Sequence, residues 1–249
     1  MERNAIIVPT YNERENIREL VHSILGLRLG SRVIIVDDNS PDGTGHLAGE
    51  LAAQLPDVGV IHRPRKLGLG TAHATGIRAA LAGGATSVVT MDADFSHDPC
   101  YIPALLNALN DFDVVVGSRY VPAGAALYCA LPRRALSRGA NLVARIVLGL
   151  CVKDSTSGFR AYSRAVLESI GMDEIVSEGY SFLIEVLYRC QQRGWHIGEI
   201  PIVFKNRQRG ASKISRSEIY KAVRTVVRLG NERSSGQFRI AWPRTGDEL

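Results

Sequence analysis

Long apolar runs are missing from this sequence of 249 residues. No uncharged apolar stretch reaches the roughly 18 residues that a membrane-spanning helix requires. The start of the chain runs from Met1 into the apolar segment 5–8, without the basic segment and long apolar stretch of a secretory signal. The sequence therefore predicts a soluble, intracellular protein.

Cysteine is scarce as well. The four cysteines lie at positions 100, 129, 151 and 190, and no two of them form a CxxC pair. Zinc knuckles and redox dithiols need closely spaced pairs, so this spacing argues against both classes of site. We expect scattered, reduced core thiols.

Complete glycine motifs for nucleotide phosphates are also absent. The segment Gly68-Leu69-Gly70 would need a glycine at position 73 to form GxGxxG, and that residue is His73. The segment follows the third apolar run, whereas a dinucleotide-binding motif follows the first. No GxxxxGK[ST] segment occurs either. These absences argue against a nicotinamide-dependent oxidoreductase and a P-loop nucleotidase.

What the chain does contain is an ordinary globular composition with an uneven charge. Hydrophobic residues make up 45% and charged residues 22%. Eleven of the 30 Lys and Arg residues fall within 205–244, which holds only two acidic residues. This segment predicts an anionic partner, such as phosphate groups or a membrane surface, or else a solvated tail. Few aromatic residues interrupt it, which disfavours nucleic acid.

The first half of the sequence alternates short β-branched runs with helical patterns. The runs lie at 5–8, 33–36, 58–61, 87–91 and 113–117. This alternation predicts an α/β fold with a mostly parallel sheet flanked by helices. In the second half we expect helices at 136–152, 181–192 and 215–229, and a strand at 196–206.

Carboxylates follow these apolar runs at the expected strand ends. In Asp92-Ala93-Asp94 an extended backbone would direct both carboxylates to one side, where they could share a hard cation such as Mg²⁺ or Mn²⁺. Capping of a helix is the alternative for this pair. The segments 9–13 and 37–44 are equally open to interpretation as helix caps and turns. Ligands of parallel α/β sheets bind beyond the carboxyl ends of the strands, which favours the functional interpretation.

Seven segments, in their order and spacing, resemble the dolichol-phosphate (polyprenyl-phosphate) mannose synthases, inverting enzymes of glycosyltransferase family 2. They read PTYNERENI, VDDNSPDGT, KLGLGTAHATG, MDADFSHDP, GSRY, RRALSRGAN and RQRGASK. The resemblance extends from about Ala5 to about Leu229. It implies a Rossmann-like GT-A fold over 1–230, with a nucleotide-sugar half at about 1–118 and an acceptor half at about 119–230. The polar tail 231–249 is expected to be poorly ordered.

The resemblance also implies the substrates and the site. The donor would be GDP-mannose, used with Mg²⁺ or Mn²⁺, and the acceptor a polyprenyl or dolichyl phosphate. The residues expected to contact the donor are Pro9, Tyr11, Glu13, Val36, Asp38, Asp92, Ala93, Asp94, Arg207 and Lys213. Metal ligation is expected from Asp92, Asp94 and Ser96, with Asp94 as the principal ligand. The acceptor phosphate is expected at Arg119, Arg133 and Ser137. Asp94, Arg119 and Arg207 are the expected catalytic residues.

Some expectations stay open at this stage. Glu178 occupies a position that is usually basic in this family, which points to a different acceptor or sugar. A different nucleotide sugar, such as UDP-glucose, and a non-catalytic binding subunit are the rival hypotheses. A lipid-linked acceptor implies peripheral attachment at the cytoplasmic face of a membrane, through apolar stripes of 136–152 and 215–229 or through a separate membrane-embedded protein. Both stripes could instead pack onto the catalytic domain.

Overall fold

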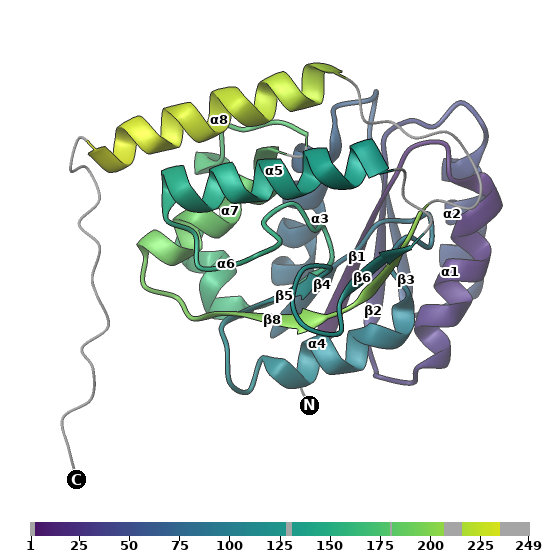
Figure 1. The fold of residues 1–249 in the computed structure, drawn as a ribbon. Helices are drawn as coiled ribbons and strands as arrows, with labels where there is room; N and C mark the ends of the chain where they lie inside the picture. The colour runs from purple at the N-terminus through teal and green to yellow at the C-terminus, as the bar shows by residue number, and fades with distance from the viewer. Residues whose placement is uncertain (1–2, 128–130, 180, 207–215, 235–249) are drawn as a thin grey trace, which may run out of the picture.

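A seven-stranded sheet forms the centre of the computed structural model, which describes residues 3–127, 131–179, 181–206 and 216–234 (Figure 1). In spatial order its strands are β3 (Val58–His62), β2 (Arg32–Asp37), β1 (Asn4–Thr10), β4 (Ser87–Thr90), β7 (Arg160–Ser163), β5 (Val114–Ser118) and β8 (Ile197–Pro201). Only β7 pairs antiparallel with its neighbours. The predicted mostly parallel sheet is therefore confirmed.

Helices cover both faces of this sheet. One face packs against α1 (Arg14–Gly26), α2 (Thr44–Gln54) and α4 (Ile102–Ala108). The other packs against α3 (Leu69–Ala82), α6 (Arg164–Ile170) and α7 (Ser181–Gln192), while α5 (Leu131–Leu148) and α8 (Arg216–Ser234) join the same apolar cluster from outside. In Figure 1, α8 runs beside α5 as an outer layer above α7, and the two outer helices contact each other. Each strand of the sheet centre is thus buried on both sides.

Strand β1 shows how the sequence produces this arrangement. Its side chains alternate, so that Ile6 and Val8 join one apolar cluster while Ala5 and Ile7 join the other. A strand with two buried faces reads as a continuous apolar run rather than as an alternation of apolar and polar residues. This explains why the five predicted runs all became strands.

The second half departs from the sequence-based expectations in three places. The expectation of a single strand at 196–206 is wrong. It is split into β8 and β9 (Val203–Lys205), because Ile202 is buried between them and bonds the backbone of Ser118 and Ala125. Strand β9 pairs with β6 (Ala125–Leu127) in a separate two-stranded sheet.

The other two departures concern helix ends and thiols. Helix α5 ends at Leu148 rather than at 152, and α8 continues to Ser234, so the first four residues of the predicted tail are helical. Residues 235–249 lie outside the described residues. Of the cysteines that the structure describes, Cys190 is buried, whereas Cys100 and Cys151 are exposed. The expectation of core thiols is therefore correct only for Cys190.

Two helical glycines give a matched test of this packing. A Cβ added at Gly76 of α3 would collide with Ile7 of β1 and would lie 3.1 Å from Val36 Cγ2 of β2. A Cβ at Gly139 of α5 would meet no atom within 4 Å. We expect Gly76→Ala to lower the free energy of unfolding by about 1–3 kcal/mol through overpacking. Gly139→Ala should raise it by about 0.5–1 kcal/mol, because alanine favours the helix.

Denaturant unfolding of both variants measures the two changes. Equal stability of Gly76→Ala and the unsubstituted protein would contradict the close packing of α3 on the sheet.

Candidate active site

The carboxyl ends of β1, β2 and β4 meet at one edge of the sheet. Thr10 pairs in register with Asp37, and its hydroxyl donates to Asp37 Oδ1 at 2.9 Å. Asp37 also accepts from the backbone and the hydroxyl of Ser40, so its carboxylate serves to fix the turn after β2. The next residue, Asp38, stands at the same edge with a different set of partners.

Asp38 forms a buried ion pair with Arg63, which the sequence analysis missed. Arg63 Nη1 lies 2.6 Å from Asp38 Oδ1, and both side chains are 6% exposed. Asp38 Oδ2 also accepts from the backbone of Leu67 and Gly68, at 3.2 and 2.9 Å. Burial lowers the pKa of Arg63 and the charge of Asp38 raises it, with a net lowering. The position of Arg63, directly after β3, was the signal available in the sequence.

The remaining expected nucleoside residues surround this pair along the same edge. Pro9 and Val36 are buried at the ends of β1 and β2. Glu13 is buried and accepts from Asn16 Nδ2 at 2.9 Å, and its backbone N–H donates to Thr44 Oγ1. The Tyr11 ring lies under the Lys66 ammonium, 4.0 Å from ring centroid to Nζ. The structure therefore brings these predicted residues together.

The loop after β4 carries Asp92 and Asp94. Asp94 is 9% exposed, and its Oδ1 accepts from the Ser96 backbone at 3.0 Å, which closes a tight turn. Phe95 within this turn has a φ of 58°, a strained conformation for a bulky residue. Ala93 is buried between the two carboxylates. The backbone of this loop is therefore held in one specific conformation.

His97 bonds to the backbone of the loop that carries Asp92 and Asp94. Its Nδ1 accepts from the Asp92 backbone at 3.3 Å and lies 3.6 Å from Asp92 Oδ2. The ring is buried between Phe159 and Phe204, with centroid distances of 5.1 and 5.6 Å. Burial lowers the pKa of His97, and the charges of Asp92 and Asp94 oppose this only in part. The imidazole is therefore neutral at pH 7.

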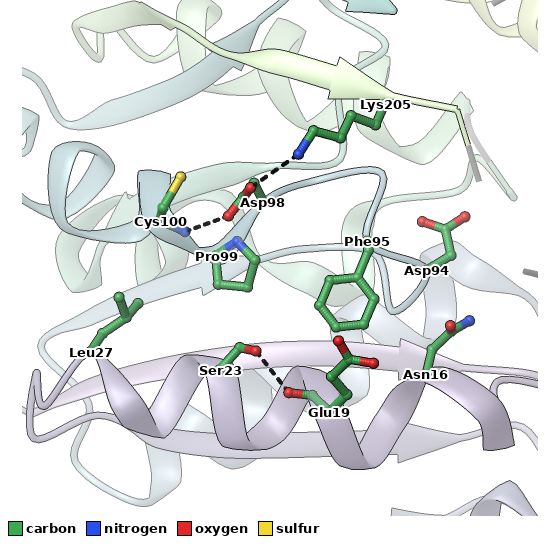
Figure 2. Close-up of a pocket in the computed structure, with 10 residues that line it drawn as sticks. All are labelled: Asn16, Glu19, Ser23, Leu27, Asp94, Phe95, Asp98, Pro99, Cys100 and Lys205. Atoms are coloured by element: carbon green, nitrogen blue, oxygen red, sulfur yellow. Dashed lines mark hydrogen bonds and ion pairs between the residues drawn. The ribbon is translucent and has the colours of Figure 1, made fainter. Parts of the chain in front are cut away.

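A pocket of about 340 Å³ adjoins the same loop (Figure 2). In this view Phe95 points toward α1, with Asp94 at one end of the group and Cys100 at the other. The backbone N–H of Lys205 donates to the Ser96 carbonyl at 3.2 Å, and Lys205 Nζ lies 3.5 Å from Asp98 Oδ2. The end of β9 is thus attached to the loop that carries Asp94.

The carboxylates of Asp92 and Asp94 are chemically suited to a divalent cation. Mg²⁺ and Mn²⁺ prefer oxygen ligands, and Mg²⁺ is commonly held by one or two carboxylates together with substrate phosphates. Among the described residues, no three His, Cys, Asp or Glu side chains form a ready metal cage. The two aspartates fit an ion that completes its coordination with substrate and water oxygens.

Arg119 forms a second polar cluster with Asp154. Arg119 Nε and Nη2 donate to the two oxygens of Asp154 at 2.7 and 2.6 Å, and Nη2 also donates to Thr156 Oγ1 at 2.7 Å. Asp154 has no exposed side-chain surface. Burial would raise its pKa, but the hydrogen bonds and charge of Arg119 outweigh burial and hold the pKa below its ordinary value. Asp154 therefore remains ionised at neutral pH.

Ser137 is linked to this cluster by hydrogen bonds through Asn141 and Thr156. Its hydroxyl accepts from the Tyr120 phenol at 2.9 Å, and its carbonyl accepts from Asn141 Nδ2 at 2.9 Å. Asn141 Nδ2 also donates to Thr156 Oγ1 at 3.1 Å. The structure thus brings Arg119 and Ser137 together. The Arg133 side chain, Arg207 and Lys213 lie outside the described parts of the chain.

Phe204 lies between the two clusters. Its ring centroid is 5.6 Å from that of His97, which supports Asp92, and 5.2 Å from Arg119 Cζ. One aromatic ring therefore contacts both the histidine that supports the carboxylates and the arginine suited to an anion. Glu178, which the sequence analysis singled out, pairs with α8 instead. Its Oε2 lies 3.1 Å from Lys221 Nζ. The Lys221 ammonium therefore offsets the negative charge of Glu178.

Comparison with known proteins places this architecture in a family. Residues 5–171 match the family model described as Glycosyl transferase family 2. The chain belongs to this family. It is a glycosyltransferase, and the resemblance stated from its motifs is confirmed.

Two curated relatives are 42% identical to this glycosyltransferase. One is named polyprenol monophosphomannose synthase, from Mycolicibacterium smegmatis, and aligns over 92% of this chain and 87% of its own. The other is named undecaprenyl-phosphate mannosyltransferase, from Micrococcus luteus, and aligns over 90% of this chain and 92% of its own.

Solved structures confirm the GT-A fold. Glucosyl-3-phosphoglycerate synthase from Mycobacterium tuberculosis, solved with Mn²⁺, UDP and phosphoglyceric acid, superposes with a TM-score of 0.66 at 21% identity, over 100% of this chain and 82% of its own. The mannosyltransferase PcManGT from Pyrobaculum calidifontis, solved with GDP-Man and Mn²⁺, gives 0.52 at 18% identity, over 94% and 76%.

The buried Asp38–Arg63 pair gives a test of how the site is built. Asp38→Ala would leave the buried Arg63 guanidinium without its carboxylate, and we expect a loss of about 3–5 kcal/mol in the free energy of unfolding. Glu50→Ala is the control, because the Arg18–Glu50 pair is exposed and should contribute less than about 1 kcal/mol. Urea unfolding measures both. Similar losses in the two variants would contradict a structural role for the Asp38–Arg63 pair.

Proposed function

We propose that this glycosyltransferase moves mannose from GDP-mannose to a polyprenyl or dolichyl phosphate, with inversion at the anomeric carbon. The observation that carries the proposal is the 42% identity, over about nine-tenths of both chains, to two enzymes named for mannosyl transfer or synthesis on polyprenyl phosphates. The two clusters that Phe204 connects supply a physical basis, because the reaction needs one site for a leaving diphosphate and one for an attacking phosphate.

The donor occupies the edge formed by β1, β2 and β4 in this proposal. Guanosine lies among Pro9, Tyr11, Glu13, Val36 and Asp38. The diphosphate lies along Asp92-Ala93-Asp94, and Arg207 and Lys213 contact its oxygens. A Mg²⁺ or Mn²⁺ ion held by Asp94 and Asp92, with Ser96 beside them, would neutralise charge on the leaving GDP. The Mn²⁺ and GDP-Man of PcManGT, which shares the fold, support this choice of cofactor and donor.

The acceptor needs no general base. A phosphate monoester has a second pKa of about 6, so its oxygens are already anionic at neutral pH. Arg119, Arg133 and Ser137 hold this group, and their task is to orient one oxygen in line with the anomeric carbon. Charge-assisted hydrogen bonds from arginine are directional enough to do so, and positioning alone can lower a barrier by several kcal/mol. Attack from the face opposite the leaving GDP inverts the anomeric centre.

A lipid-linked acceptor requires contact with a membrane. Within the described residues, no helix is long and apolar enough to cross one. Helices α5 and α8 instead expose a row of apolar side chains, namely Leu136, Leu142, Val143, Ile146, Val147, Tyr220, Val223 and Val227. Only their opposite sides, with Ala144, Leu148, Val226 and Leu229, pack into the core. We propose that this outer face, together with Lys221 and Arg224, attaches the enzyme peripherally to the cytoplasmic leaflet.

Removal of one carboxylate tests the catalytic proposal. We expect Asp94→Ala to lower transfer of labelled mannose from GDP-mannose to undecaprenyl phosphate by at least about 100-fold, because diphosphate charge is no longer offset by the metal. Label extracted into the organic phase, with Mg²⁺ or Mn²⁺ present, measures the transfer. The control is Asp57→Ala, at an exposed turn, which should transfer normally. Normal turnover in Asp94→Ala, or transfer from UDP-glucose in place of GDP-mannose, would contradict the proposal.

A pair of charge substitutions tests membrane attachment. Ile146→Glu with Val223→Glu should weaken sedimentation with phosphatidylglycerol vesicles at low salt by at least about tenfold, since it removes apolar contact and adds repulsion. The control adds the same charge at Ala53→Glu and Gln54→Glu, at exposed positions of α2 on the other side of the sheet. High salt should release the unsubstituted protein. Failure of that protein to sediment at low salt would favour recruitment by a membrane-embedded partner.

A further inference from the structure

Asp154 is a buried carboxylate whose hydrogen bonds converge on one arginine. Its Oδ2 accepts from the backbone and Nε of Arg119 at 3.0 and 2.7 Å. Its Oδ1 accepts from Arg119 Nη2 at 2.6 Å and from Thr156 Oγ1 at 3.2 Å. Two parallel bonds to one edge of a guanidinium fix both its plane and the direction of its remaining nitrogen. The orientation of Arg119 is thus determined by Asp154.

The loop that carries Asp154, residues 153–157, is itself held by hydrogen bonds from two neighbouring elements. Glu199 of β8 accepts from the backbone of Lys153 and Asp154 at 2.8 and 3.0 Å. Asn141 of α5 accepts from the backbone and the hydroxyl of Ser155 at 2.7 and 2.8 Å. These bonds attach the loop to an edge strand and to an outer helix.

A buried arginine supplies the third clamp on this loop. Arg160 of β7 has no exposed surface, and it donates to the carbonyls of Ser155 and Ser157, each at 2.7 Å. A third bond reaches the Leu183 carbonyl on α7 at 2.7 Å. The 153–157 loop is therefore held rigidly by the sheet, and Asp154 has little freedom to move with Arg119.

The same loop reaches Ser137, the other described residue of the proposed acceptor site. Thr156 Oγ1 accepts from Arg119 Nη2 and from Asn141 Nδ2, and that same amide donates to the Ser137 carbonyl. One hydrogen-bonded chain therefore sets the positions of Arg119 and Ser137 relative to each other. The Asp154 charge offsets that of Arg119, so the pair contributes direction to anion binding rather than net charge.

We propose that Asp154 is the positioning residue for the acceptor phosphate. It orients the Arg119 guanidinium and, through Thr156 and Asn141, fixes its placement relative to Ser137. This inference rests on the proposed function, because it concerns the phosphate that Arg119 is proposed to hold.

The chain offers a closely matched control for this proposal. Glu185 of α7 is also a carboxylate with no exposed surface, and it lies 2.7 Å from Arg189 Nη2. Arg189 is 12% exposed and Arg119 is 13% exposed, so the two pairs are alike in burial. Glu185 pairs with Arg189 within α7 and with Arg228 of α8, which bonds the two helices together outside both clusters of the site. Asp154→Asn and Glu185→Gln therefore remove the same kind of interaction.

Steady-state kinetics distinguish positioning from mere structural support. We expect Asp154→Asn to lower kcat/KM for undecaprenyl phosphate by about 10–100-fold, as loss of a group that orients a ligand typically does. The KM for GDP-mannose should stay within about twofold, because Asp154 makes no contact with the donor edge. Glu185→Gln should change neither parameter. Equal kinetics of the two variants, beside an active unsubstituted enzyme, would overturn the inference.

A double-mutant cycle tests whether Asp154 acts through Arg119. In an Arg119→Ala background, Asp154→Asn should cause no further loss in kcat/KM for the acceptor, since its target is gone. If the two substitutions instead lowered kcat/KM independently, so that their fold-losses multiplied in the double variant, the inference would be overturned. Thr156→Val, a smaller change at the same loop, should give the same kind of acceptor-specific loss and serves if Asp154→Asn does not fold. An unsubstituted enzyme without transfer to undecaprenyl phosphate would instead overturn the proposed function, and this inference with it.

Discussion

Burial of both faces of the central sheet is the constraint on which the rest of the structure depends. Apolar side chains of β1, β2 and β4 fill the space toward the helices on either side, so the polar groups of these strands gather at the strand ends and just beyond them. The parallel order of these three strands then brings their carboxyl ends to one edge. Asp38 and the Asp92–Asp94 segment, distant in sequence, become neighbours along this edge for that reason.

Two buried ion pairs complete the site, and in each an aspartate holds an arginine in place. Asp38 holds Arg63 at the proposed nucleoside end, and Asp154 holds Arg119 at the proposed acceptor end. A buried guanidinium without its carboxylate would be costly, so each pair makes a fixed arginine compatible with the fold. Because each pair is neutral as a whole, the proposed mechanism assigns the net positive charge at the diphosphate to the metal ion and to Arg207 and Lys213.

The sequence was informative where one physical rule acted alone. Continuous apolar runs predicted β1 to β5, and the carboxylates after them predicted a polar edge of the sheet. It was uninformative where contacts from distant elements decide the outcome. Strand β7 begins with the charged and fully buried Arg160, which no strand pattern predicts. This arginine is accommodated because carbonyls of the 153–157 loop and α7 accept its hydrogen bonds. Asp154 likewise resembles an ordinary turn residue, and only its contact with Arg119, 35 positions away in the chain, reveals its role.

The configuration of the product tests the central claim most directly, namely a single in-line transfer between a metal-bound diphosphate and a phosphate held by Arg119. Unlabelled GDP-mannose, whose mannose is α-linked, would be incubated with the enzyme and a short-chain polyprenyl phosphate. The one-bond carbon–hydrogen coupling at the anomeric centre of the purified product would then be measured by NMR. Single displacement predicts a β-linked mannosyl phosphate. An α-linked product would contradict it, because a single displacement from the face opposite the leaving GDP cannot retain the configuration.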